Sequence, residues 1–292
     1  MTLLQAIIMG VIQGLAEFLP ISSSGHLAIF KNVFHVELDT GMMFDVLLHV
    51  GTLIAVFICF WSDIRKMIVE GFKILGDCFA NIGILFSNPF RKERKKYHRI
   101  VSGSYRKFVI LVLVSTIPTG ILGYLGKDLV EAAGENMLII GVCLLITAFL
   151  LFICDRAVPG RKTPKNISYP NAFGIGIAQG IATLPGISRS GMTITAGVLS
   201  GFDRKFAVKY SFIMSIPAIC GAVVLDVKDM VSSDIPSQEW MYYLIGMLIA
   251  AVIGFLCIKF VLVLTRNRKF KYFGFYCILM GLLSILYYYN II

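Results

Sequence analysis

Six apolar runs, each long enough to cross a bilayer, constrain this chain more than any other feature of its sequence. A hydrocarbon core about 30 Å thick needs roughly 20 predominantly apolar residues per helix. The runs are residues 43–61, 108–125, 137–154, 209–226, 240–264 and 273–290. Charged residues make up only 15% of the chain, against about 25% in an ordinary soluble domain. The sequence therefore predicts an all-α integral membrane protein with six transmembrane helices and no large soluble domain.

Two further apolar segments, residues 1–30 and 171–200, are interrupted before they reach spanning length. They break at LPISSSGH (19–26) and LPGISRSGMT (184–193), where proline, glycine and hydroxyl residues stop a helix. Irregular backbone is tolerated at membrane depth only where it is buried in protein or lines a cavity. We therefore expect two re-entrant helix-loop-helix elements in addition to the six spans.

Lysine and arginine are distributed unequally between the connections. Residues 62–107, 155–170, 201–208 and 265–272 together hold 21 of them, whereas residues 27–42, 126–136 and 227–239 together hold three. Because cytoplasmic loops of membrane proteins carry the excess of basic residues, the basic connections are assigned to the cytoplasm and both termini to the outside. The net charge of +10 is thus an orientation signal, and no nucleic-acid partner is expected.

An internal repeat relates the two interrupted segments. A shift of 166 residues aligns Gln13–His26 with Gln179–Met192 without gaps, and seven of the 14 positions are identical. Each copy is followed by three spans, an odd number, so the second copy enters the membrane upside down relative to the first. The chain is therefore predicted to comprise two inverted repeats, residues 1–154 and 155–292. Such repeats bring the tips of broken helices together near the bilayer midplane, where we expect the functional site.

Arg189 lies at the break of the second interrupted segment, between Ser188 and Ser190. Helix N-termini present free amide donors and about half a positive charge, which favours an anion. A guanidinium adds a planar fork of donors that matches phosphate better than lysine does. Since a charge in an apolar segment costs about 2.5 to 3.5 kcal/mol on insertion scales, a phosphate-binding role is favoured over simple snorkelling to the interface.

Glu17 lies in the first interrupted segment, where His26 is the only other ionisable side chain among residues 1–30. Intramembrane acids are functional candidates. Glu17 is expected to coordinate a cation, to position a proton, or to pair with Arg189 and hold the two segments together. Gln13 lies one turn earlier on the same helix face.

Ser22, Ser23 and Ser24 place hydroxyl groups close to His26. A hydroxyl beside a base can act as a nucleophile, but serines also cap helices, and spacing alone leaves both interpretations open. In the second copy Ser22 and Ser24 recur, whereas Ser23 is replaced by Arg189 and His26 by an apolar residue. The shared residues are predicted to form the scaffold and the differing ones to divide the chemistry.

Polar residues elsewhere allow two interpretations each. Asp45 and His49, four residues apart on the first span, either line the cavity or are satisfied polar residues between helices. The basic stretch at residues 91–99 either contacts anionic lipid headgroups or is solvated. The chain has no CxxC, HExxH or GxxxxGK[ST] pattern, which argues against a zinc or P-loop enzyme.

The two interrupted segments carry motifs that resemble those of the bacterial undecaprenyl-diphosphate phosphatases of the bacitracin-resistance type. The first is Gln13-Gly-Leu-Ala-Glu17 followed by FLPISSSGH, and the second is Pro185-Gly-Ile-Ser-Arg-Ser-Gly-Met-Thr193. The resemblance covers essentially the whole chain, including FDVLLHVGTLIAV after the first motif. It implies an integral-membrane hydrolase that converts undecaprenyl diphosphate to the monophosphate and inorganic phosphate, and thereby confers bacitracin resistance.

Carried over by position, the resemblance implies a role for each site residue. It assigns catalytic roles to Glu17 as the essential acid, to Ser23 as the nucleophile with His26 as its partner, and to Arg189, which binds the diphosphate with Ser188, Ser190 and Thr193 as supporting donors. Gln13 and Ser22 of the first motif are also expected to bind the substrate phosphate. It also implies a divalent cation, Mg²⁺ with Ca²⁺ as the alternative, held by Glu17 and the substrate phosphates. Many family members have glutamate where this chain has Gln13, so a two-carboxylate metal site is not expected here.

The expected partners are a polyprenyl diphosphate and the lipids of a bacterial plasma membrane, with the site open to the outside. The sequence leaves open whether Ser23, His26 or water attacks the phosphorus, and whether the chain forms a homodimer. A second class remains as an alternative, because inverted repeats with broken helices are typical of transporters. In that interpretation the protein is a lipid-phosphate flippase or an anion-coupled transporter.

Overall fold

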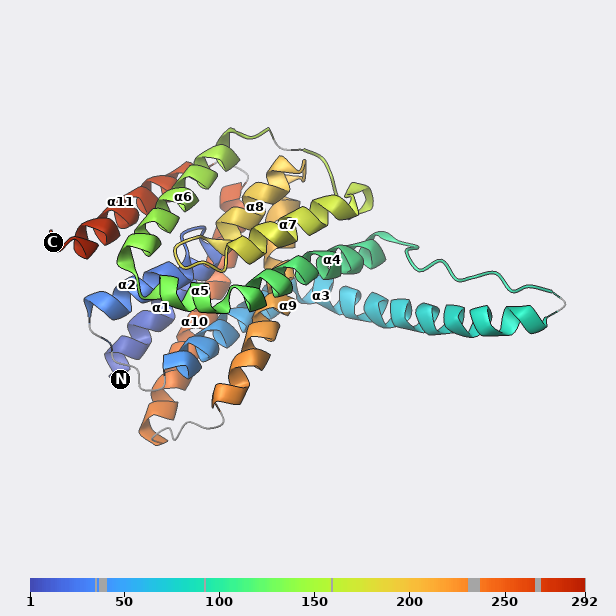
Figure 1. Ribbon diagram of the computed structural model, residues 1–292, viewed down its shortest axis with the longest axis horizontal. Coiled ribbons are helices and arrows are strands. Elements are labelled where there is room, and N and C mark those ends of the chain that lie inside the picture. The colour runs from blue at the N-terminus through green and yellow to red at the C-terminus, as the bar shows by residue number, and fades with distance from the viewer. Residues whose placement is uncertain are drawn as a thin grey trace.

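A computed structural model describes residues 1–34, 36, 41–91, 93–158, 160–230, 237–265 and 269–291. Over these residues the regular structure is helical apart from one isolated bridge between Lys162 and Phe202. The α-helices, shown in Figure 1, are α1 (Leu3–Phe18), α2 (Ser23–Val33), α3 (Gly41–Ser87), α4 (Ser104–Leu125), α5 (Lys127–Gly134), α6 (Met137–Arg156), α7 (Tyr169–Ile181), α8 (Arg189–Leu199), α9 (Arg204–Met230), α10 (Ser237–Leu264) and α11 (Lys271–Tyr288). The described residues also contain two 3₁₀ turns, Asn88–Phe90 and Pro164–Asn166.

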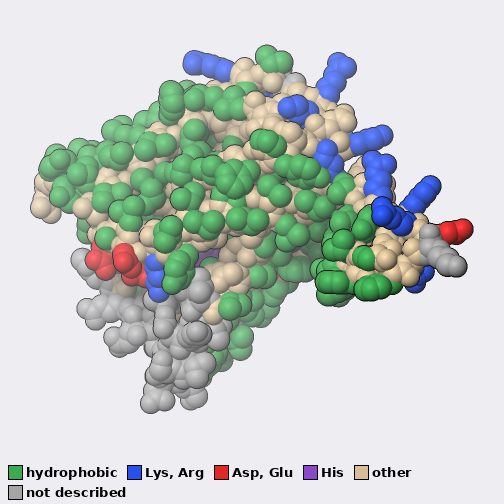
Figure 2. Space-filling view, turned by 45° about the vertical axis from the view of Figure 1, so that its right-hand side comes forward, with side chains coloured by type: hydrophobic (Ala, Val, Ile, Leu, Met, Phe, Trp, Pro, Cys, Tyr) green, Lys and Arg blue, Asp and Glu red, His purple; other side chains and the backbone are tan. Residues whose placement is uncertain are grey.

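The six expected spans are confirmed as helices long and apolar enough to cross a membrane, and they lie in α3, α4, α6, α9, α10 and α11. Their hydropathy and number make this a multi-pass membrane protein. Space-filling Figure 2 shows hydrophobic side chains over most of the visible face, with lysine and arginine gathered toward one end. This distribution parallels the unequal basic content of the connections.

The connection expected at residues 62–107 is largely helical, which corrects the sequence-based assignment. α3 continues for 47 residues to Ser87, with non-helical dihedral angles only at Phe60. At 1.5 Å per residue it is about 70 Å long, more than twice the hydrocarbon thickness. Most of the basic residues of this region follow the helix, and only Arg65, Lys66 and Lys73 lie within its 62–87 part. The second half of α3 therefore projects from the helical body, as Figure 1 shows.

Both interrupted segments form pairs of short helices, α1 with α2 and α7 with α8. α1 ends at Phe18 because Leu19 precedes Pro20 and adopts an extended conformation (φ −65°, ψ 139°), as residues before proline usually do. Each second helix begins with a serine cap: Ser22 accepts the N–H of Gly25, and Ser188 accepts the N–H of Gly191. The two caps are equivalent under the 166-residue shift.

The packing pairs helices from opposite halves of the chain. α1 packs along α10, α7 along α4, α6 along α11, and α3 lies between α9 and α10. Small residues allow these close approaches, as is common between membrane helices. A Cβ on Gly51 of α3 would overlap the backbone oxygen of Met247 in α10. At Gly51, α3 is therefore packed directly against the backbone of α10.

Replacing Gly51 by alanine is expected to lower the free energy of unfolding by about 1–3 kcal/mol, because overpacking forces backbone shifts. Gly71→Ala in the same helix is the matched control, since a Cβ there meets open space. That change is expected to stabilise the helix by up to about 1 kcal/mol. Unfolding of the purified variants in detergent measures both effects, and equal stability of the two would contradict the close packing of α3 on α10.

Candidate functional site at the junction of the two helix pairs

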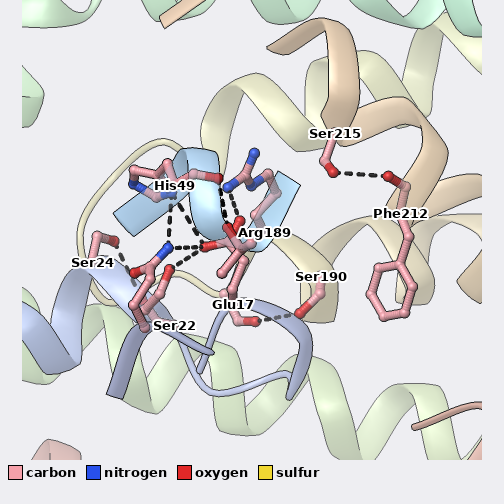
Figure 3. Close-up of polar contacts among 12 residues, drawn as sticks. Glu17, Ser22, Ser24, His49, Arg189, Ser190, Phe212 and Ser215 are labelled. Atoms are coloured by element: carbon pink, nitrogen blue, oxygen red, sulfur yellow. Dashed lines mark hydrogen bonds and ion pairs between the residues drawn. The ribbon is translucent and has the colours of Figure 1, made fainter. Parts of the chain in front are cut away.

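An ion pair joins the two short-helix pairs at the centre of the molecule. Nη2 of Arg189, the first residue of α8, contacts Oε1 of Glu17, near the end of α1. The Glu17 side chain is 4% exposed and that of Arg189 23%. Figure 3 shows both side chains turned toward each other, as the sequence analysis expected of one common pocket. The carboxylate is thus buried, whereas the guanidinium retains access from outside the protein.

The second oxygen of Glu17 accepts hydrogen bonds from two further side chains. Ser23 Oγ donates to Glu17 Oε2 at 2.7 Å, and Gln13 Nε2 donates to the same oxygen at 3.0 Å. Gln13 and Glu17 are four residues apart and share one face of α1, whereas Ser23 comes from the start of α2. Three residues predicted from the sequence therefore meet at one carboxylate.

His49 also belongs to this cluster, although the sequence left its role open. Its Nδ1 lies 2.9 Å from Gln13 Nε2 and 3.6 Å from Glu17 Oε2, and Figure 3 shows it beside Glu17. Asp45, one turn earlier in α3, instead pairs with Lys31 at 2.5 Å. The four-residue spacing of Asp45 and His49 on the first span indicated that they could line a cavity. It did not indicate which of the two side chains lies at the site.

The backbone at the two helix breaks forms the frame of the site. Ser22 has a φ of 73°, in the left-handed region that residues other than glycine rarely occupy. Its buried Oγ accepts the N–H of Gly25 at 3.3 Å and that of Gly186 at 3.1 Å. Gly186 belongs to the break before α8. One serine hydroxyl therefore caps α2 and links the two breaks.

The structure does not bring His26 to Ser23. His26 Nδ1 lies 2.8 Å from the backbone oxygen of Ser22, and Nε2 lies 2.8 Å from the hydroxyl of Tyr276 in α11. The two rings also stack at a centroid distance of 5.4 Å. Both ring nitrogens therefore have partners other than Ser23, which pairs with Glu17 instead. Tyr276 was missed by the sequence analysis because its contact spans 250 residues and no motif marks it.

The remaining predicted phosphate ligands are buried and hydrogen-bonded within the protein. Ser188 caps α8 through its hydroxyl, and its N–H donates to Thr147. Ser190 donates to the backbone oxygen of Leu19 at 3.4 Å. Thr193 donates to the backbone oxygen of Arg189 and lies 2.6 Å from Ser211. In this arrangement these hydroxyls position Arg189 and the start of α8.

The side-chain oxygens at this site fit a metal cation that is coordinated mainly by oxygen atoms of a bound ligand. Among the described residues, no group of three or more His, Cys, Asp or Glu side chains is placed to hold a metal ion. Gln13 Oε1, however, is buried and has no hydrogen-bond partner among them, and it lies on the residue that bonds Glu17. One carboxylate and one free amide oxygen fit Mg²⁺, which often binds through few protein ligands together with substrate phosphates.

These features define the chemical capacity of the site. The N-termini of α2 and α8 start at the junction, so their free amides and dipoles favour an anion there. Arg189 adds a partly accessible guanidinium, and the Ser23 hydroxyl donates to a buried carboxylate that can accept a proton. The fold and site define an integral membrane protein in which a guanidinium and a paired hydroxyl and carboxylate meet beside two helix N-termini.

Comparison with known proteins agrees with this description. The family described as bacitracin resistance protein BacA matches residues 6–283. Undecaprenyl-diphosphatases from Methanosphaera stadtmanae and Halothermothrix orenii are each 38% identical to this chain, over 97% and 98% of both sequences respectively. Undecaprenyl-diphosphatase 4 of Bacillus thuringiensis subsp. konkukian is 34% identical over 98% of this chain and 97% of its own length. The chain belongs to the BacA family.

The link through Ser22 predicts a measurable contribution to stability. Ser22→Ala leaves the buried N–H of Gly186 unpaired, which is expected to cost about 1–3 kcal/mol of unfolding free energy. Ser24→Ala is the control, because Ser24 is exposed and its side-chain hydrogen bond among the described residues is with the Ser22 hydroxyl, at 3.5 Å. Detergent unfolding compares the two, and an equal, negligible effect of both changes would show that Ser22 does not join the breaks.

Proposed function

We propose that this protein is an integral-membrane phosphatase that hydrolyses undecaprenyl diphosphate to undecaprenyl phosphate and inorganic phosphate. The observation that carries this proposal is the pairing of Ser23 and Arg189 with the buried carboxylate of Glu17 inside a membrane protein of the BacA family. An amphiphilic diphosphate brings its anionic group to such a site while its hydrocarbon tail stays among the spans. Removal of phosphate regenerates the lipid carrier and lowers the amount of the diphosphate that bacitracin sequesters.

The topology proposed for this enzyme is an inverted repeat with two re-entrant helix pairs. The cross-packing supports it, because α1 of the first half packs on α10 of the second, and α7 of the second packs on α4 of the first. Such reciprocal contacts are expected of halves related by a pseudo-two-fold axis in the membrane plane. The short lengths of α2 and α8, 11 residues each, also fit elements that enter the membrane without crossing it.

In the proposed reaction Arg189 transfers from Glu17 to the terminal phosphate of the substrate. A buried carboxylate that loses a cationic neighbour accepts a proton more readily. Glu17 then takes the proton of Ser23, whose Oγ attacks the terminal phosphorus as the bond to the bridging oxygen breaks and undecaprenyl phosphate leaves. Water hydrolyses the resulting phosphoserine and releases inorganic phosphate. Arg189 and the amides at the starts of α2 and α8 stabilise charge on the transferred group, which is the main protein contribution in phosphoryl transfer.

His26 has a positioning role in this scheme. Its Nδ1 faces the backbone of Ser22, next to the attacking residue, and Tyr276 fixes the ring from the other side. Mg²⁺ or Ca²⁺, when bound, would be held by Glu17, Gln13 Oε1 and the substrate phosphates, and would neutralise charge on the diphosphate.

The basic connections support a cytoplasmic location for the basic end of the molecule. We place the protein in the bacterial plasma membrane with the site open to the outer side, as the family resemblance implies. Its partners in this proposal are the polyprenyl diphosphate and membrane lipids. Formation of a homodimer remains a prediction, which the oligomeric state of the purified protein would test.

Replacing Arg189 by alanine is expected to lower kcat/KM for undecaprenyl diphosphate by roughly 10² to 10⁴, by analogy with loss of an oxyanion donor. Arg189→Lys keeps the charge but loses the planar fork, so its activity is expected to lie between that of the wild type and that of Arg189→Ala. The measurement is phosphate release by the purified protein in detergent with Mg²⁺ present. Arg65→Ala, which removes an exposed cation outside the site, is the control, and normal release by Arg189→Ala would refute its proposed role.

Ser23 separates hydrolysis from transport. If the hydroxyl attacks phosphorus, Ser23→Ala abolishes phosphate release. Ser24→Ala is expected to retain it, because Ser24 is adjacent to Ser23 in sequence but bonds Ser22 and not Glu17. A flippase or anion transporter needs no nucleophile. Parallel assays of phosphate release and of lipid translocation in vesicles distinguish the classes. Translocation without hydrolysis by the wild-type protein would overturn the phosphatase proposal.

A further inference from the structure

The projecting half of α3 forms an arm that the phosphatase site does not use. We define the α3 arm as Trp61–Ser87 together with the described residues of the return segment 88–103. The helical part is about 40 Å long at 1.5 Å per residue, and the return segment runs back beside it toward α4, as Figure 1 shows. The arm therefore extends well beyond the six-helix body.

One face of the arm is a continuous apolar stripe. Its members recur every three or four residues and are 48–71% exposed: Ile68, Phe72, Leu75, Phe79, Ile82 and Phe86. The exposed Trp61 and Arg65 lie between the stripe and Ile54 and Ile58, which are exposed on the spanning part of the same helix. Since those residues belong to a transmembrane span, the stripe continues a lipid-facing surface.

The opposite face is polar and is covered by the return segment. Glu70 and Asp77 bind Arg106 at the start of α4, and Asn81 exchanges two hydrogen bonds with the backbone of His98. These contacts fix the rotation of the helix, with its polar face toward the return segment. The arm is thus amphipathic, with the apolar face left uncovered.

A basic hollow lies on the flank between the two faces. It has a volume of about 560 Å³ and is lined on the α3 side by Ala80, Gly83, Ile84 and Ser87. Arg91, Lys95 and Lys96 of the return segment line its edge. When the stripe is immersed in acyl chains, a flank at this height lies at the level of lipid headgroups.

We propose that the α3 arm lies in the membrane interface, with its apolar stripe among the acyl chains and the headgroup of an anionic phospholipid in the basic hollow. The net positive charge of the arm favours an anionic membrane surface over a second copy of the arm. Residues 61–99 contain nine Lys and Arg against four Asp and Glu, so two arms repel each other, whereas an anionic leaflet attracts them. The width of the apolar face, which extends to Val69 and Leu85 beside the stripe, also exceeds a coiled-coil seam and suits an interfacial helix.

A single tryptophan on the arm tests the immersion of the stripe. The chain contains only two tryptophans, at positions 61 and 240, so Trp61→Phe and Trp240→Phe provide a background for Phe79→Trp. Lys73→Trp, on the polar face, is the matched control, and Phe86→Trp repeats the measurement on the stripe. The full-length variants are reconstituted into phosphatidylcholine vesicles with or without bromine on the acyl chains.

Bromine is expected to quench the tryptophan of Phe79→Trp and Phe86→Trp severalfold more strongly than that of Lys73→Trp. Equal quenching of all three would overturn the proposal. Emission at short wavelength that is insensitive to bromine at 79 and 86 would also overturn it, because protein, such as a second copy of the chain, would then cover the stripe.

The basic hollow is tested with the charge-removing variant Arg91→Gln, Lys95→Gln, Lys96→Gln in the Phe79→Trp background. Brominated vesicles containing equal phosphatidylcholine and phosphatidylglycerol are expected to increase quenching relative to phosphatidylcholine alone. The variant is expected to lose this increase while it keeps the quenching seen in phosphatidylcholine. An undiminished increase in the variant would refute headgroup binding in the hollow.

Discussion

The contact between Glu17 and Arg189 is the interaction on which the arrangement of this protein depends. It joins the end of α1 to the start of α8 across 172 residues of sequence. Breaking a buried ion pair by removal of one partner typically costs about 3–5 kcal/mol, because a charge is then left without compensation. The pair thus holds the short helices together, and in the proposed reaction it also keeps a guanidinium available to an incoming phosphate.

The two helix pairs share a frame and differ in chemistry. Ser22 and Ser188 make the same cap at the same offset, so both breaks place the N-terminus of a short helix at the centre. The following position is Ser23 in one copy and Arg189 in the other, and these two side chains bind opposite oxygens of one carboxylate. A hydroxyl and a guanidinium therefore meet at one carboxylate, because equivalent backbone positions carry different residues.

Much of this organisation could be predicted from the sequence because local physical rules determine it. Apolar run length located the six spans, Pro20 and Pro185 marked the breaks, and the cost of an intramembrane charge singled out Glu17 and Arg189. Contacts set by tertiary packing could not be predicted. His26 bonds Tyr276 on the last helix, and Ser23, which follows the left-handed backbone of Ser22, donates to Glu17. The basic residues of 62–107 indicated a connection, although the apolar residues of its 62–87 part recur with a helical period.

A double-mutant cycle on Glu17 and Arg189 tests the central claim most directly. The unfolding free energies of Glu17→Gln, Arg189→Gln and the double variant are compared with that of the wild type in detergent. If the two side chains compensate each other in the buried junction, the double variant is more stable than the sum of the single effects implies, with a coupling of about 1–3 kcal/mol. Single effects that add within about 0.5 kcal/mol would show that the two helix pairs do not meet through this ion pair.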